Sequence, residues 1–248
     1  MQRVQFREII KIALRLRVNY LMNYHSYKTK IWLNFLQKYQ VVETSSKLFA
    51  SSGGLCSVAR KGNIGDGKPY LKRHPKMESR VIEETNLIVA DFKNQDRLYD
   101  GLIYMMFKNL NGNVTPLYIG MTEKKGKSNN LSANILNLET NKGKFARWGD
   151  GYQYHIGDLS AVVLHGHEET AKSKKYKEWA ASMFTEFPTD LPTLAEPIMF
   201  WCKAWSPNNV GVWEEFGPTT LTFLEYQLIG VASSLFANSL LNKEGQNR

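Results

Sequence analysis

The stretch GLIYMMFKNLNGNVTPLYIGM, residues 101–121, decides the fold. Its first part, Gly101–Lys108, is strongly apolar, and Leu117–Met121 is apolar again, so each is predicted to form a strand. Between them, Asn109–Pro116 contains Asn-Gly-Asn at positions 111–113, which favours a tight turn. We therefore predict an antiparallel hairpin in this part of the chain.

The segments after the hairpin alternate between helix-like and strand-like patterns. A polar loop rich in Lys, Ser and Asn leads into a helix-like segment that ends near Trp148, and a short apolar run follows at Leu159–Leu164. Further along, Lys172–Glu186 is helix-like, Pro197–Trp205 resembles a strand, and Thr220–Leu241 is an apolar helix. A hairpin combined with segregated helices predicts an α+β fold.

Charge is distributed unevenly along the 248 residues, whose net charge is +9. Residues 1–80 hold 16 Lys or Arg and 4 Asp or Glu, whereas residues 81–248 hold 16 and 19. This asymmetry indicates that the N-terminal part meets a polyanion, with nucleic acid the first candidate and an acidic membrane surface the second. We therefore predict a basic helical arm with a Gly- and Lys-rich loop in residues 1–95, and a compact domain in residues 96–248.

The basic arm has several interpretations. Its cationic residues recur at every fourth position near the start of the chain, namely Arg3, Arg7, Lys11 and Arg15. A second helix-like stretch covers Thr29–Tyr39, and the Gly-rich, basic stretch Ser51–Arg80 resembles a mobile loop. The helices could pack on the core with solvated cationic faces, lie on DNA phosphates, form a targeting presequence, or rest on a membrane surface.

Several classes of protein are disfavoured. No stretch approaches the roughly eighteen uninterrupted apolar residues of a membrane span. Residues 1–17 carry charges throughout, so we expect no secretory signal. Cys56 and Cys202 lack the spacing of a zinc site and cannot build a disulfide framework. We therefore expect a cytoplasmic protein with no membrane among its partners, and a membrane-associated protein held by its N-terminal helix stays an alternative.

Three features of the domain hint at chemistry. Tyr104 and Tyr118 lie on the two strands of the predicted hairpin and can approach each other, and Gly120 permits a close approach just beyond them. Arg147 is the only arginine between Arg97 and Arg248. Such a lone arginine suits the binding of a phosphate, because a guanidinium group holds its N–H donors in a fixed planar arrangement.

The third feature is Glu225, the only charged residue between Phe216 and Leu241. A lone carboxylate in an apolar helix is costly to bury unless it is paired or binds a cation. Glu225 is therefore a candidate metal ligand.

In this order, the elements resemble the GIY-YIG nuclease family. The matching elements are Leu102-Ile103-Tyr104, Tyr118-Ile119-Gly120, Arg147, Glu225 and Asn238. The resemblance covers roughly Asp100–Asn242, about three-fifths of the chain. It implies a small antiparallel sheet of about three strands flanked by helices, so that residues 96–248 would form the nuclease domain.

The sequence departs from the family pattern in its spacings. The two tyrosines are 14 residues apart, which implies a hairpin longer than in the shortest members. The 29 residues from Tyr118 to Arg147 resemble the restriction-enzyme branch rather than the compact repair and homing enzymes.

Two positions remain open. The family often carries a His or Tyr soon after the arginine, and Tyr152, Tyr154 and His155 all suit that role, with Tyr152 and His155 taken as site candidates. The asparagine of the last helix could be Asn242 instead of Asn238.

The resemblance implies hydrolysis of a DNA phosphodiester by an in-line water, which leaves a 5′-phosphate. Tyr104 would be the general base, assisted by a cation because a free phenol has a pKa of about 10. Glu225 would hold one Mg²⁺, for which Mn²⁺ can substitute. Arg147 would stabilise charge on the phosphate, Tyr118 would bond phosphate or water, and Asn238 would brace the Glu225 region. The assisting cation could be Lys124, Lys125, Lys142 or Lys144.

The preferred hypothesis is a type II restriction endonuclease that cuts a short site in double-stranded DNA. Palindromic sites are usually met by symmetric dimers, so this hypothesis is compatible with a homodimer and implies a bacterial or phage-like host. The alternative is a homing or repair-type, structure-specific endonuclease targeted by residues 1–95. A third hypothesis is a non-catalytic DNA-binding protein, against which the presence of all the catalytic residue types argues.

Overall fold

The computed structural model describes residues 24–60, 67–126, 128–136 and 156–246, which form a mixed α and β fold. The α+β class is therefore confirmed. The main sheet is antiparallel and has four strands in the order β1-β8-β6-β7, with two small hairpins beside it. The elements are β1 (Ser46–Lys47), β2 (Ser51–Ser52), β3 (Leu55–Cys56), β4 (Val58–Arg60), β5 (Pro69–Leu71), α2 (Pro75–Asn94), β6 (Gly101–Leu110), β7 (Asn113–Glu123), α3 (Ile156–Val163), η1 (Glu169–Ala171), α4 (Lys174–Met183), β8 (Ile198–Trp205), η2 (Glu214–Phe216) and α5 (Leu221–Leu235), preceded by a helix over residues 24–38.

The predicted hairpin is present, but its turn is tighter than expected. Leu110 pairs with Asn113, so only Asn111 and Gly112 form the loop, and both have positive φ, 51° and 87°. Positive φ at both central residues is the property of the type I′ turn that suits the twist of paired strands. The strands therefore extend through most of the stretch that we expected to be a loop.

A register shift in the hairpin places the two tyrosines. Met106 pairs with Tyr118 and Phe107 with Pro116, so Leu117 is an extra residue in β7. Proline is tolerated there because β7 is an edge strand. Beyond the bulge, Tyr104 lies directly across from Gly120.

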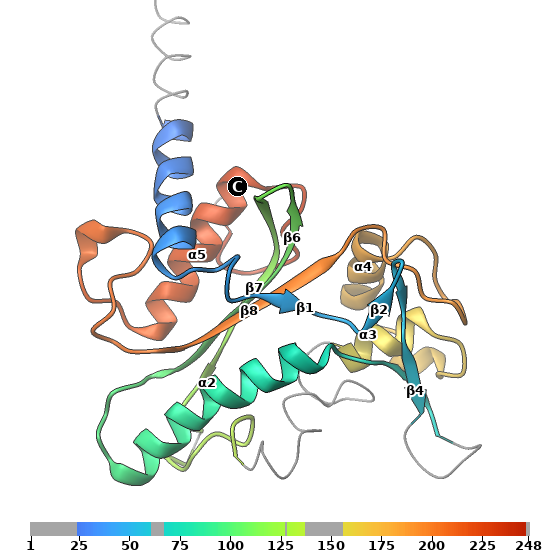
Figure 1. Cartoon of the computed structure of the whole chain (residues 1–248), viewed down its shortest axis with the longest axis horizontal. Coiled ribbons are helices and arrows are strands. Elements are labelled where there is room, and N and C mark those ends of the chain that lie inside the picture. Colours follow the sequence, from blue (N-terminus) through green and yellow to red (C-terminus); the bar gives the residue numbers. More distant parts are fainter. Residues whose placement is uncertain (1–23, 61–66, 127, 137–155, 247–248) are drawn as a thin grey trace, which may run out of the picture.

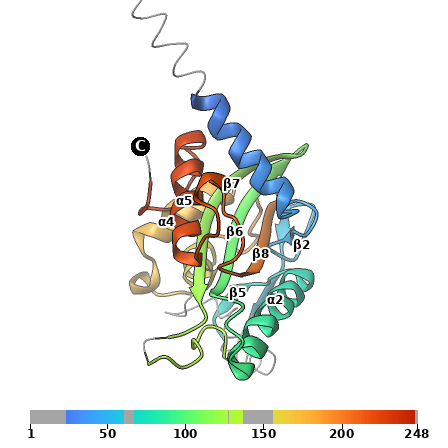
Figure 2. The same ribbon diagram turned by 90° about the vertical axis from the view of Figure 1, so that its left-hand side faces the viewer.

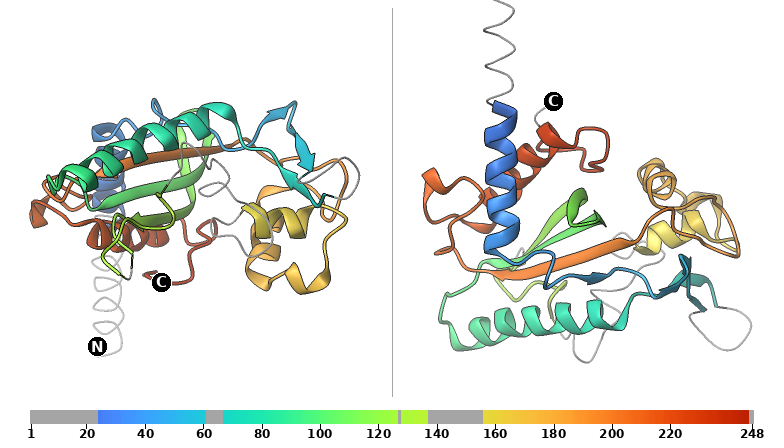
Figure 3. Two further views of the ribbon diagram at one scale, coloured as in Figure 1. Left: turned by 90° about the horizontal axis from the view of Figure 1, so that it is seen from below. Right: turned by 45° about the horizontal axis from the view of Figure 1, so that its top comes forward.

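Helices cover both faces of the sheet, as Figures 1 and 2 show. One face packs against α2, α3 and α4, and the other against α5 and the helix over residues 24–38. The view from below in Figure 3 shows the sheet between α2 on one side and α5 on the other. Because both faces are covered, every residue of Gly101–Phe107 in β6 is buried. The continuous apolar run of the sequence is therefore an inner strand of the sheet, between β8 and β7.

The segment before the hairpin is more ordered than the sequence predicted. The stretch expected to be a mobile loop, residues 51–80, instead forms the hairpins β2–β3 and β4–β5 and the beginning of α2, apart from residues 61–66, which lie outside the described part. The side chain of His74 caps the N-terminus of α2 by accepting from the backbone N–H of Lys76, and Pro75 begins the helix. Within the described residues, no helix is both long and apolar enough to cross a bilayer.

Residues on either side of position 95 share the same cores. Trp32 and Phe35 of the helix over residues 24–38 are buried in the cluster that contains Trp201, and β1 pairs with β8. In this helix the apolar face packs inward while Lys30 is exposed, as in the first of the interpretations of the arm. The residues Arg3, Arg7, Lys11 and Arg15 lie outside the described part of the chain.

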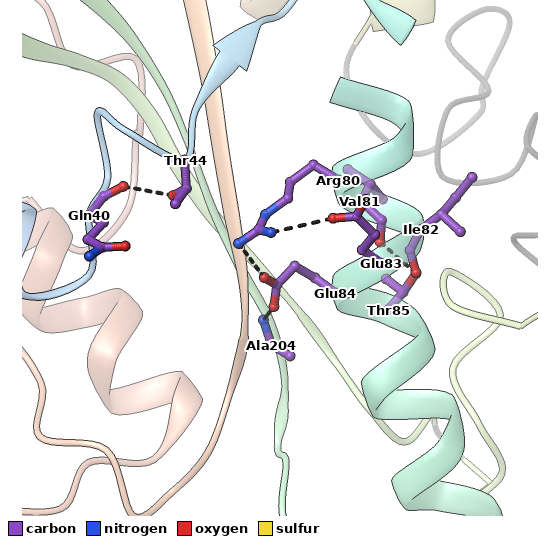
Figure 4. Close-up of polar contacts among 9 residues, drawn as sticks. All are labelled: Gln40, Thr44, Arg80, Val81, Ile82, Glu83, Glu84, Thr85 and Ala204. Atoms are coloured by element: carbon purple, nitrogen blue, oxygen red, sulfur yellow. Dashed lines mark hydrogen bonds and ion pairs between the residues drawn. The ribbon is translucent and has the colours of Figure 1, made fainter. Parts of the chain in front are cut away.

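A buried glutamate satisfies a backbone N–H group at the outer edge of β8. Beyond the two-residue strand β1, the backbone N–H of Ala204 donates to the carboxylate of Glu84 on α2 at 2.7 Å. Arg80, one turn earlier on α2, forms an ion pair with the other oxygen of Glu84 at 2.7 Å (Figure 4). The carboxylate thus takes the place of a neighbouring strand, and α2 is held against the sheet.

A second buried ion pair joins α2 to the end of β7. The ammonium of Lys124 donates to the Asp91 carboxylate at 2.6 Å, and the side chain of Asp91 is 1% exposed. Asp91 also accepts from the backbone N–H groups of Leu98 and Tyr99. Burial by itself would raise the pKa of Asp91, but these hydrogen bonds and the charge of Lys124 outweigh it and lower the pKa below 3.8.

The variant Asp91→Asn is expected to lower the free energy of unfolding by about 3 kcal/mol, because it leaves the ammonium of Lys124 largely buried without its countercharge. Because the folded pKa of Asp91 is depressed, its contribution is present at neutral pH and is lost as the pH falls through that folded value. Urea unfolding at pH 7 and at pH 3 measures both effects. A variant as stable as the wild type at pH 7 would contradict this account.

Candidate active site

A pocket of about 380 Å³ lies beside the edge strand β7. Its walls come from β7, α4, α5 and the segment that follows α5. They are formed by Tyr118, Lys175, Glu225, Tyr226, Ile229, Leu241, Asn242, Lys243 and Glu244. The pocket therefore brings two phenols, two carboxylates and two ammonium groups into one polar site.

The free edge of β7 explains why these elements meet. The carbonyl of Leu117 accepts from the N–H of Leu241 at 2.7 Å. Two residues along β7, the side-chain amide of Asn242 accepts from the N–H of Ile119 at 3.0 Å and donates to its carbonyl at 2.8 Å. Two residues further, the N–H of Met121 donates to the carboxylate of Glu225.

Alternate residues of a strand present their backbone groups to the same edge, so these contacts form one continuous seam. Each satisfies a backbone group that an edge strand would otherwise leave unpaired. The seam brings the carboxylate of Glu225 and the amide of Asn242 to β7.

The two tyrosines form a hydrogen-bonded pair on one face of the hairpin. Their ring centroids are 6.2 Å apart, and the hydroxyl of Tyr104 donates to that of Tyr118. Tyr104 is only 4% exposed, whereas Tyr118 lines the pocket. A Cβ atom at Gly120 would stand 2.5 Å from the Tyr104 hydroxyl oxygen, so a glycine is needed there for the phenol to cross the neighbouring strand.

The surroundings of Tyr118 and Glu225 disfavour the negatively charged forms of both side chains. Burial, and next the negative charge of Glu225, raise the pKa of Tyr118 to about 12, while the hydrogen bond from Tyr104 acts in the opposite direction. Burial also raises the pKa of Glu225; the hydrogen bond from Met121 opposes this, and the charge of Glu244 adds to it. An added cation in the pocket would relieve both effects.

Lys175 is a site residue that sequence reasoning missed. It lies on α4 with its Nζ atom 5.5 Å from the ring centroid of Tyr118. Of the lysines proposed to assist Tyr104, Lys124 is instead paired with Asp91, and Lys125 is exposed. Lys175 carried no signal that distinguished it from its helical neighbours, because only the fold brings it to Tyr118.

The remaining predicted residues divide into two groups. Asn238 is exposed beyond the end of α5 and does not line the pocket, whereas the alternative Asn242 is buried in the seam. α5 ends at Leu235, six residues earlier than expected for the helix Thr220–Leu241, so Asn242 reaches β7 from an extended segment. The other candidates, Arg147, Tyr152, Tyr154, His155, Lys142 and Lys144, lie outside the described residues.

The donor set of the pocket suits a hard divalent cation. In the part of the chain that the structure describes, no cluster of three or more His, Cys, Asp or Glu side chains is arranged to hold a metal. Glu225 and Glu244 nevertheless line the same pocket, and the charge of Glu244 raises the pKa of Glu225. One or two carboxylates together with water and phosphate oxygens are ordinary ligands for Mg²⁺.

Replacing Gly120 by alanine tests the tyrosine pair. The added methyl group would displace the Tyr104 phenol, and we expect a loss of roughly 1–3 kcal/mol in the free energy of unfolding. The displaced phenol should also lose its hydrogen bond to Tyr118. The Cζ atom of the Tyr104 ring would also stand 2.6 Å from the new methyl group, so the whole ring has to be removed to relieve the clash. Gly120→Ala should therefore cost less free energy of unfolding in a Tyr104→Ala background than in the wild type. Denaturant unfolding of the two single variants and the double variant measures this difference, and equal costs in both backgrounds would contradict the packing.

Comparisons with family models, with curated proteins and with solved structures each returned no significant match, so the GIY-YIG resemblance rests on the residues of this chain alone.

Proposed function

We propose that this chain is a metal-dependent endonuclease that hydrolyses phosphodiester bonds in double-stranded DNA. The observation that carries the proposal is the meeting of Tyr118, Glu225 and Asn242 at one pocket, with Tyr104 hydrogen-bonded behind Tyr118. These residues come from β6, β7, α5 and the segment after it. They represent four of the five elements, in the chain order, on which the GIY-YIG resemblance was built, with Asn242 in place of Asn238; the fifth, Arg147, lies outside the described residues.

Glu225 is the residue proposed to bind Mg²⁺. Its carboxylate receives a hydrogen bond from the N–H of Met121, which fixes one side of the group, yet burial still raises its pKa. A buried carboxylate of this kind is stabilised by a cation more than by water. When bound, Mg²⁺ would supply positive charge to stabilise the leaving oxygen of the phosphodiester. Among the described residues, Glu244, which lines the same pocket, is the candidate for a second carboxylate ligand.

The tyrosines are assigned different roles from those that the family resemblance implied. Tyr118 lines the pocket and can contact water or substrate, whereas Tyr104 is buried behind it. Burial raises the pKa of Tyr118 to about 12, and the hydrogen bond donated by Tyr104 opposes this rise. In the proposed reaction Tyr118 first loses its own proton to solvent, and Tyr104 together with a bound cation would stabilise the resulting phenolate. The phenolate then accepts the proton of the attacking water.

Asn242 is proposed to position the site rather than to touch the substrate. Both polar atoms of its side chain are engaged by Ile119, which adjoins Tyr118 in β7. This double hydrogen bond holds the wall of the pocket against the strand that carries the phenol. The finer assignment, a type II restriction enzyme that leaves a 5′-phosphate and acts as a homodimer, rests on the family resemblance.

The variant Glu225→Gln tests the metal site. Incubation with plasmid and phage DNA and Mg²⁺ should give cleavage by the wild type and a loss on the order of 100-fold or more in the variant. Glu83→Gln, a change of the same kind at an exposed position of α2, is the matched control and should cleave as the wild type does. Discrete fragments would support a restriction enzyme, and cleavage of branched substrates alone would support a repair-type enzyme. Absence of cleavage on all DNA substrates with Mg²⁺ or Mn²⁺ would refute the endonuclease proposal.

The variants Tyr118→Phe and Tyr104→Phe separate the two phenols. Tyr118→Phe should abolish cleavage, because it removes the proposed base. Tyr104→Phe removes only the hydrogen bond that lowers the pKa of Tyr118, so its activity should require a higher pH. Loss of a hydrogen bond to a charged group predicts a shift of the acidic limb of the pH–rate profile by about one to two units. The opposite pattern, with Tyr104→Phe inactive and Tyr118→Phe active, would return the role of base to Tyr104.

A further inference from the structure

The surroundings of Lys175 differ from those of the other lysines on α4. Its Nζ atom lies 5.5 Å from the ring centroids of Tyr118 and Tyr176 and 5.6 Å from that of Trp179. Lys174 and Lys177, on the same helix, are exposed. Aromatic faces attract an ammonium group and fix its position, but they do not neutralise its charge.

Within the described ranges, no carboxylate forms a close ion pair with Lys175, although two of them act on its charge. The neighbouring lysines have close partners, since Lys172 pairs with Glu169 and Lys243 with Glu178. Around Lys175, the acidic groups that act on its charge are Asp158 of α3, which accepts a hydrogen bond from Tyr176, and Glu244 of the segment after α5. Burial outweighs their influence and lowers the pKa of Lys175. The charged ammonium is therefore held in place while it lacks full compensation.

We propose that Lys175 forms a phosphate subsite of the pocket, which binds a phosphodiester group of a nucleic acid backbone. The ammonium group of Lys175 favours the binding of an anion, whereas the carboxylates of Glu225 and Glu244 in the same pocket favour the binding of a cation. A phosphate that carries a divalent cation provides both charges at once. A free carboxylate ligand would compensate only the lysine, and a lone metal ion would compensate only the two glutamates. This inference rests on the proposed function for the identity of the phosphate as part of DNA.

The subsite also explains why Lys175 lies next to Tyr118. A phosphodiester held by the ammonium would have its phosphorus within reach of a water that contacts the phenol, which is the positioning that hydrolysis requires. Lys175 is therefore predicted to touch the substrate directly.

The binding test uses the full chain with its lysines labelled by reductive [¹³C]methylation and observed by NMR. Three aromatic rings near Nζ should move the Lys175 signal away from those of the exposed lysines, and the variant Lys175→Arg identifies it by its loss. Addition of inorganic phosphate, and separately of a thymidine dinucleotide, should shift this signal to saturation while the Lys177 signal stays in place. A saturable shift with the dinucleotide at lower concentration than with phosphate supports a nucleic acid subsite. A Lys175 signal that neither probe moves would overturn the proposal.

The cleavage test compares Lys175→Met with the matched control Lys177→Met, two residues away on the same helix. Lys175→Met should reduce kcat/KM by on the order of 100-fold, Lys175→Arg should restore part of it, and Lys177→Met should behave as the wild type. Thermal unfolding shows whether a variant has lost its fold, and the NMR titration of the wild type holds whatever the fate of the variants. Full activity in Lys175→Met would overturn the subsite. Saturable phosphate binding by a wild type that cleaves no DNA would support the subsite and refute the endonuclease proposal.

Discussion

The open edge of β7 is the constraint on which the rest of the site depends. An edge strand leaves every second N–H and carbonyl without a partner, and these groups must be satisfied if other elements are to pack over them. Leu241, Asn242 and Glu225 meet this need with backbone, amide and carboxylate groups in turn. A structural requirement of the sheet thus determines where the carboxylate of α5 stands, and the pocket follows from it.

The same combination of backbone pairing and buried charge recurs toward the opposite edge of the sheet, at β8. Glu84 accepts from Ala204 where β1 no longer covers β8, and Arg80 compensates its charge (Figure 4). The two acids differ in their countercharge. Glu84 has a close arginine, whereas in the described part of the chain no such partner accompanies Glu225, whose burial raises its pKa. This contrast separates an acid that holds the fold together from one that is available to a ligand.

The sequence predicts the local elements better than the contacts between them. The apolar run of β6 and the Asn111-Gly112 turn follow from local chemistry, and the α+β class follows from them. α2 was missed because it begins within a Gly- and Lys-rich stretch, although Pro75 and the left-handed Gln95 mark its ends.

The site was predictable only where a residue was unusual in its own surroundings. Glu225 stands alone in an apolar segment and could be singled out. Lys175 could not, because Lys174 and Lys177 look the same in the sequence and only packing against distant rings distinguishes them. The seam also affects how the chain folds during synthesis. The hairpin leaves the ribosome long before residues 241–242, so the nascent chain carries both tyrosines while the segment that completes the pocket wall is still missing. The pocket can therefore assemble only after synthesis has passed residue 242.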